Sequence, residues 1–148
     1  MKAFVVVCLS SLLAFSAFAH DGHDDGGDAT TTSPHKGDHT GEFCTDASQT
    51  ICAHLHFLAD VNTSTEGSFV AHIETPDNQP INNFKIDMWM QMGSHGHGSA
   101  PFEVADNGQN HYTITNAWFV MPGTWTVRID FDFNGVHQHI EIPVTAAQ

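Results

Sequence analysis

The segment that most constrains the fold of this chain is TWTVRIDFDFNGVHQHIEIPV, residues 124 to 144. It contains Asn134-Gly135, the preferred dipeptide of a two-residue type I′ turn, which predicts an antiparallel hairpin in which Phe133 pairs with Val136. That first pair fixes every later one. Counting outward from the turn, the apolar face pairs Phe131 with Gln138, Ile129 with Ile140, Val127 with Ile142 and Trp125 with Val144. The hairpin therefore presents a core face.

The other face of the hairpin carries charges in matching positions. The same register pairs Asp132 with His137, Asp130 with His139 and Arg128 with Glu141. Cross-strand pairs of opposite charge are favourable by several tenths of a kcal/mol. A slip of one residue would send the whole apolar set to solvent. Both considerations support this register.

The rest of the domain shows the same alternation and almost no helical pattern. Short alternating segments separated by turn residues predict strands at 51–59, 68–75, 83–92, 101–105, 111–117, 124–133 and 136–144. Seven short strands over about 100 residues are typical of an immunoglobulin-like sandwich. We therefore expect an all-β fold, an immunoglobulin-like antiparallel sandwich of about seven strands, over residues 42–148.

Two N-terminal segments are expected to stand outside this domain. Residues 1–19 combine Lys2, an apolar run and a small-x-small cleavage motif ending at Ala19, which predicts a secretory signal peptide. Residues 20–41 contain no large apolar side chain, so we expect a disordered His/Asp-rich segment. No run reaches the roughly 20 apolar residues of a membrane-spanning helix. The mature protein is expected to be periplasmic or secreted, with no membrane span.

Charge narrows the range of partners. Removal of Lys2 with the signal leaves three basic residues against 17 acidic ones, a net charge of −14 with histidines neutral. Nucleic acid and anionic lipid both require a basic surface, so neither is an expected partner. All 12 histidines follow residue 19. This excess, together with the acidity, favours a metal ion as the partner.

Two cysteines remain after the signal, Cys44 and Cys52. In an oxidising compartment an isolated pair of this kind is usually a disulfide. If reduced, Cys52 would form a Cys-x-His-x-His set with His54 and His56, which suits copper or zinc. We expect the disulfide, with both histidines as metal ligands.

Three His-x-His pairs fall on predicted strands or strand ends. They are His54 and His56, His95 and His97, and His137 and His139. Residues i and i+2 of a strand point to the same face with Cα atoms about 6.5 Å apart, so two imidazoles can converge on one ion. Three such pairs in one small domain predict metal binding.

The central pair lies in the run MQMGSHGHGSAP, whose glycines predict a loop after a strand of alternating methionines. Met88 is expected to fill the core, whereas Met90 and Met92 lie closest to His95 and His97. Thioether and imidazole together select Cu(I) over zinc. We expect Met92, His95 and His97 to bind copper.

The hairpin pair, His137 and His139, faces Asp130 and Asp132. Each carboxylate can bind a metal directly or orient an imidazole through its second nitrogen. An ordinary solvated face of acids and histidines explains the same pattern, and both readings remain open. His72, on the face opposite the apolar side chains of its strand, is expected to point to solvent.

The run IDMWMQMGSHGHGSAPFEV, followed by HYTITNAWFVMPGTWTVRIDF, resembles the YtkA-like and FixH-like domains. Their pattern is a strand ending in Met-x-x-Met-Gly-His-Gly, a Tyr-containing strand and an aromatic-Met-x-Gly-x-Trp segment. The resemblance covers about residues 65 to 146. It implies an exported or membrane-tethered immunoglobulin-like sandwich associated with copper handling or cytochrome oxidase assembly. The Met-Gly-His-Gly element maps onto Met92, Gly93, His95 and Gly96, with Ser94 inserted and a second histidine added.

These observations predict an exported metal-binding protein, for copper first and zinc second, that acts as a carrier, buffer or resistance factor. The alternative is a non-metal immunoglobulin-like module that docks on an envelope protein. We do not expect an enzyme, because the chain has no Gly-x-Ser-x-Gly motif, no phosphate loop and no free Cys/His couple. A copper oxidase built on an N-terminal His20 is the remaining catalytic alternative, and it needs a second, rigidly placed histidine.

Overall fold

The structure is a computed structural model that describes residues 32–45 and 50–148. The predicted signal peptide, residues 1–19, lies outside the described residues, as does the first part of the His/Asp-rich segment. The described part of the chain contains no helix long and apolar enough to cross a membrane.

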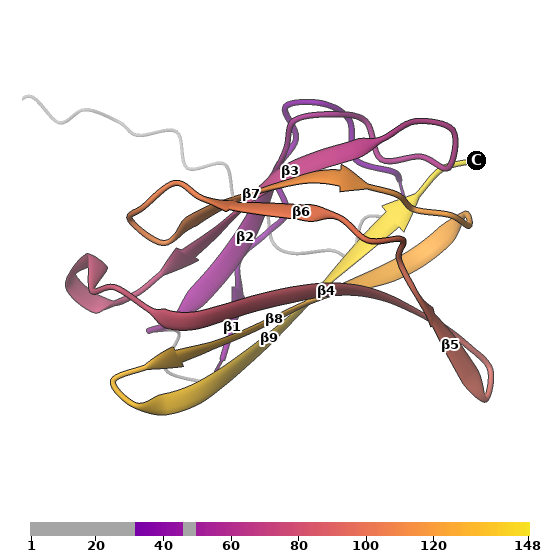
Figure 1. Cartoon of the computed structure of the whole chain (residues 1–148). Helices are drawn as coiled ribbons and strands as arrows, with labels where there is room; N and C mark the ends of the chain where they lie inside the picture. Colours follow the sequence, from indigo (N-terminus) through magenta and orange to yellow (C-terminus); the bar gives the residue numbers. More distant parts are fainter. Residues whose placement is uncertain (1–31, 46–49) are drawn as a thin grey trace, which may run out of the picture.

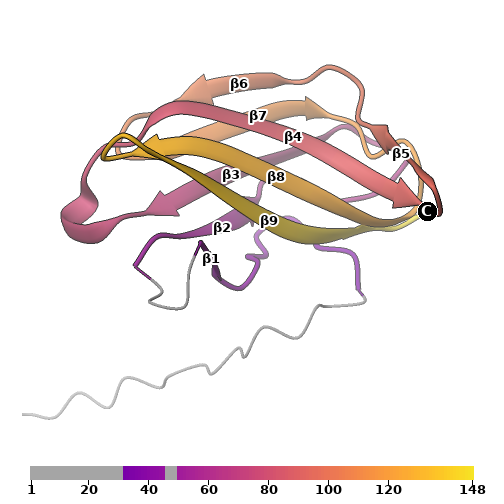
Figure 2. The same ribbon diagram turned by 90° about the horizontal axis from the view of Figure 1, so that it is seen from below.

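Two antiparallel sheets form the domain, and their strands lie in two layers face to face (Figure 1 and Figure 2). The five-stranded sheet has, in spatial order, β1 (Phe43–Cys44), β2 (Cys52–Phe57), β3 (Gly67–Glu74), β7 (His111–Ala117) and β6 (Glu103–Asp106). The four-stranded sheet has β5 (His95–Gly98), β4 (Asn82–Met92), β8 (Gly123–Phe133) and β9 (Val136–Ala146). A short 3₁₀ turn, η1 (Pro76–Asn78), connects β3 to β4.

This strand order is that of an immunoglobulin-like sandwich. Strands β2, β3, β7 and β6 take the order A-B-E-D, and β4, β8 and β9 take the order C-F-G, with β5 beside β4. The predicted fold class is therefore confirmed. Two short strands, β1 and β5, were not among the seven predicted.

The terminal hairpin has the register that its turn predicts. Phe133 pairs with Val136, and the pairs continue in step to Gly123 and Ala146. The apolar face of this hairpin lies in the core, where Trp125 is fully buried. The other large, fully buried side chains come from both sheets and from the loops after β2 and β7: Phe57, Phe69, Phe119, Phe131, Leu55, Ile73, Met88, Ile114, Ile129, Ile142 and Val61.

The run predicted as a loop around His95 is instead a hairpin. After a turn at Gly93 and Ser94, residues 95–98 return along β4 as β5. Gly93 has a φ of 57°, a left-handed value that glycine tolerates. Gly96 has a different role, because a Cβ there would lie 2.3 Å from Cζ2 of Trp89. The prediction read these glycines as flexibility, whereas Gly96 leaves space for an indole.

The His/Asp-rich segment is ordered where the structure describes it. The segment was predicted to be disordered over residues 20–41, yet residues 33–40, here called the strap, lie along β2. Backbone bonds join Gly37 N to Phe57 O at 2.8 Å and Thr40 N to Leu55 O at 2.9 Å. The prediction considered only side-chain burial, but this segment is held by main-chain pairing to an edge strand.

Candidate metal centre

Two histidines and a glutamate converge on the outer face of the five-stranded sheet. Strands β2 and β3 pair in a register that places His54 directly opposite His72 and Cys52 opposite Glu74. Nδ1 of His54 lies 3.7 Å from Oε1 of Glu74, and Nδ1 of His72 lies 4.0 Å from the same oxygen. One ligand atom from each of the three residues lies within 4.8 Å of the other two.

The alternation of β2 and β3 produces this arrangement. Ala53, Leu55 and Phe57 on β2 are buried, so the histidines between them must point outward. On β3, Phe69 and Ile73 are buried in the same way, which leaves His72 and Glu74 on the outer face. The disulfide between Cys44 and Cys52, as predicted, ties β1 to β2 at the end of this face nearest Glu74.

Both histidines of the group are largely enclosed, His54 with 21% and His72 with 23% of the side chain exposed. The ring of His72 stacks on His111 of β7 with ring centroids 3.8 Å apart. His54 contacts the ring from β2 in an edge-on arrangement at 5.0 Å. Burial, and then the neighbouring imidazoles of His111 and His54, lower the pKa of His72 to about 4. His72 is therefore neutral at neutral pH, as a metal ligand must be.

The three donors fit a first-row transition ion. Metal-ligand distances of about 2.0–2.1 Å in a tetrahedral site place donors about 3.3–3.4 Å apart. The two separations that involve Glu74, 3.7 and 4.0 Å, exceed that by about half an ångström, and the two imidazole nitrogens lie within 4.8 Å of each other. The three side chains would therefore move closer together to hold one ion. Two imidazoles and a carboxylate leave one position open, and the exposed Glu74 gives solvent access to it.

His56 does not join this group, although it was predicted as the partner of His54. Nδ1 of His56 instead shares a hydrogen bond of 2.9 Å with Nε2 of His39 in the strap. The two residues face each other across an isolated antiparallel bridge, with ring centroids 4.2 Å apart.

The β4–β5 hairpin brings the predicted copper ligands side by side. Met92 pairs with His95, and Met90 pairs with His97, so all four lie on one face of the hairpin. The imidazoles of the two histidines are 6.4 Å apart between centroids. Met90 is only 5% exposed and packs in the core, whereas Met92 is 45% exposed. Copper binding by Met92, His95 and His97 stays a prediction.

The β8–β9 face is an array of ion pairs. His139 places Nδ1 2.9 Å from Oδ1 of Asp130 and Nε2 3.3 Å from Oε1 of Glu141. The hydrogen bond with Asp130 is the main cause that raises the pKa of His139. His137 has Asp130 at 3.2 Å and Asp132 at 3.6 Å. Since protonation competes with metal binding at an imidazole, this geometry favours the solvated-face reading.

The three His-x-His pairs are separated by the topology. His54 and His56 lie on the five-stranded sheet, while the other pairs lie on β5 and β9, the two opposite edges of the four-stranded sheet. The group that does form joins His54 to His72 and Glu74, neither of which was predicted as a ligand. One feature of the sequence pointed to this group: both β2 and β3 alternate between buried and outward-facing residues, and each carries a histidine on its outward face.

Fold and site together define an all-β sandwich domain with an imidazole-carboxylate cluster on the outer face of one sheet. The model of the YtkA-like family matches residues 45–130, more than half of the chain, so the protein belongs to the YtkA-like family. No curated protein and no solved structure gives a significant match.

Proposed function

We propose that this protein binds a divalent transition-metal ion through His54, His72 and Glu74 and acts as a metal carrier or buffer. The observation that carries the proposal is the convergence of three ligand atoms within 4.8 Å on an accessible sheet face. The low pKa of His72 supports it, because that ring offers a lone pair without first losing a proton.

The donor set favours Cu(II), with Zn(II) second. Two nitrogens and one oxygen contain no sulfur, so the group does not select Cu(I). Among divalent first-row ions, a given nitrogen and oxygen site generally binds Cu(II) most tightly. The mature net charge of −14 attracts cations in general. Copper, expected from the sequence as Cu(I) or Cu(II), therefore remains the proposed ion, at a site that shares only His54 with the predicted ligands.

The proposed place of action is the periplasm or the extracellular space. The signal sequence of residues 1–19 supports export, and the disulfide between Cys44 and Cys52 suits an oxidising compartment. The proposal includes no catalytic step.

A metal titration of the full mature chain tests this proposal. Cu(II) or Zn(II) at about 100 times the dissociation constant should stabilise the folded protein by about 2.7 kcal/mol, seen as a higher Tm. His72→Gln and Glu74→Gln should each weaken binding at least about tenfold, because each removes a donor.

The matched control is the double variant His95→Ala/His97→Ala, which removes the β5 histidines from the other sheet. It tests the separate prediction for Met92, His95 and His97, and it should leave intact the part of the Cu(II) affinity that His72→Gln and Glu74→Gln remove. Unchanged affinity in His72→Gln and Glu74→Gln would rule out the proposed site. A wild-type Tm that no metal raises would favour the alternative function, a docking module for an envelope protein.

A further inference from the structure

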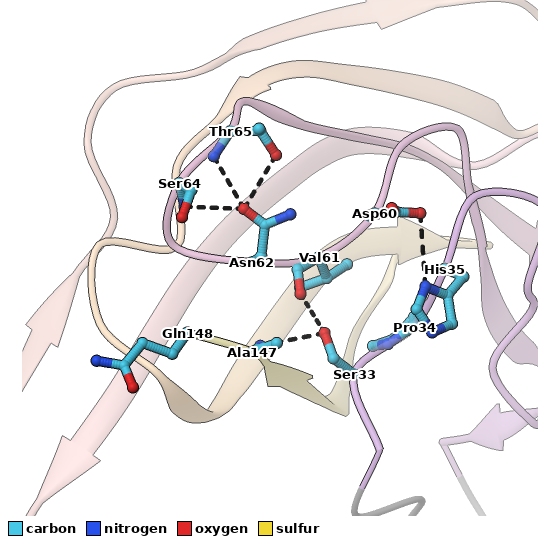
Figure 3. A pocket seen from close by; sticks show the side chains of 10 residues that line it. All are labelled: Ser33, Pro34, His35, Asp60, Val61, Asn62, Ser64, Thr65, Ala147 and Gln148. Carbon is cyan, nitrogen blue, oxygen red and sulfur yellow. Dashed lines mark hydrogen bonds and ion pairs between the residues drawn. The ribbon is translucent and has the colours of Figure 1, made fainter.

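The strap is fastened to the domain at both ends. At its start, Val61 N donates to Pro34 O at 2.9 Å and Lys36 N donates to Oδ1 of Asp60 at 2.7 Å. The hydroxyl of Ser33 donates to the carbonyl oxygen of Val61. Ser33, Pro34, Asp60 and Val61 lie around a shallow cavity of about 320 Å³ between the strap, the loop after β2 and the C-terminus (Figure 3). This end is held by main-chain and short polar contacts.

At its other end the strap meets β2 through two imidazoles. Phe57 N donates to Asp38 O at 2.9 Å, which brings the next residue, His39, opposite His56. Nε2 of His39 and Nδ1 of His56 are 2.9 Å apart. A hydrogen bond at this distance needs one nitrogen to carry a proton and the other to offer a lone pair.

The same two nitrogens have the spacing of a metal chelate. Metal-nitrogen distances of about 2.0 Å place cis donors about 2.8 Å apart in a square plane and about 3.3 Å apart in a tetrahedron. The observed 2.9 Å lies closer to the square-planar value, which is the geometry of Cu(II). We propose that a Cu(II) ion bound between His39 and His56 replaces this hydrogen bond and locks the strap onto β2.

The second site is separate from the group on β2 and β3. The ring centroids of His39 and His54 are 6.0 Å apart. His54 therefore stays available to the group with His72 and Glu74, and the second site adds to the proposed function without depending on it.

Trypsin provides a direct test, because Lys36 lies within the strap. Cleavage after Lys36 requires the strap to leave β2, so its rate follows the population of the released strap. Cu(II) at about ten times its dissociation constant should slow that cleavage about tenfold in the full mature chain. Lys85 and Arg128, on β4 and β8, are internal controls, because cleavage there reports unfolding of the domain.

His39→Gln and His56→Gln should each abolish the protection by Cu(II), whereas His72→Gln should retain it. His39 is exposed, so its replacement leaves the core intact. Hydrogen exchange at the Gly37 and Thr40 amides provides a second measurement that needs no protease. Cu(II) should slow this exchange in the wild type and in His72→Gln, but not in His39→Gln or His56→Gln.

Protection that persists in His39→Gln and His56→Gln would overturn the proposal, as would a wild-type strap that Cu(II) does not protect. If His72→Gln removes metal-dependent stabilisation of the domain but keeps strap protection, the two sites are independent. If only strap protection is absent, the second site fails and the proposed function stands.

Discussion

Acid should destabilise the metal-free protein through His72. The folded-state pKa of His72 is lowered from 6.5 to about 4, so the folded protein binds fewer protons than the unfolded chain between these values. The contribution of His72 to the free energy of unfolding is therefore fully present above about pH 6.5 and is lost as the pH falls to about 4. The ring is three-quarters enclosed, which makes solvent screening modest.

The magnitude follows from the same interval. At about 1.4 kcal/mol per pH unit, the range from about 6.5 to about 4 amounts to at most about 3 kcal/mol. The charged groups that face His72 are His54 from β2, Glu74 from its own strand and His111 from β7. Protonation of the other two histidines adds repulsion, while Glu74 offsets part of it.

The measurement is urea unfolding, followed by tryptophan fluorescence, of wild type and His72→Gln in the presence of a chelator. Between about pH 7 and about pH 4 the wild type should lose about 3 kcal/mol more unfolding free energy than the variant. The difference between the two proteins removes the titration of the many carboxylates they share. Parallel pH dependences would refute the assignment of acid sensitivity to His72.

Three further effects should be measurable. Gly96→Ala should destabilise the protein by about 1–3 kcal/mol, because the added Cβ meets the Trp89 indole at 2.3 Å. Gly98→Ala is the control, because the nearest neighbour of its added Cβ is 3.9 Å away. Equal urea midpoints for the two variants would contradict the steric reason. Replacing Cys44 and Cys52 by alanine should lower the free energy of unfolding by about 2–3 kcal/mol, because the unfolded chain regains loop entropy. A free energy of unfolding equal to that of the wild type, taken from a chevron plot, would contradict this. His139→Gln should reduce stability below about pH 6.5 and converge with wild type as the pH rises, because the folded-state pKa is raised; a variant that is less stable only at high pH would contradict this sign.

Local patterns predicted the fold, and the terminal hairpin shows why. Asn134-Gly135 fixes one pair, the pleat then fixes the face of every residue beyond it, and the observed register agrees at each step. The same alternation placed His54 and His56 on the polar face of β2. These features depend on neighbours within a few residues of one another.

The site depends on pairings that no short turn fixes. The connection between β2 and β3 spans residues 58–66, so the sequence gives no direct count that places His54 opposite His72. Stacking with His111 requires the neighbour of β3 to be β7, four strands later in the chain. The pairing of His39 with His56 was not predicted, because its segment has no apolar pattern and main-chain pairing leaves no compositional mark.

The pairing of the strap with β2 also bears on self-association. Within β2, β1 pairs only with Cys52 and Ala53, so without the strap the main chain of residues 55–57 would form a bare sheet edge. Bare edges recruit strands from other molecules. Release of a segment this short would expose a template for edge-to-edge aggregation, so residues 37–40 would contribute to solubility without contributing to the core.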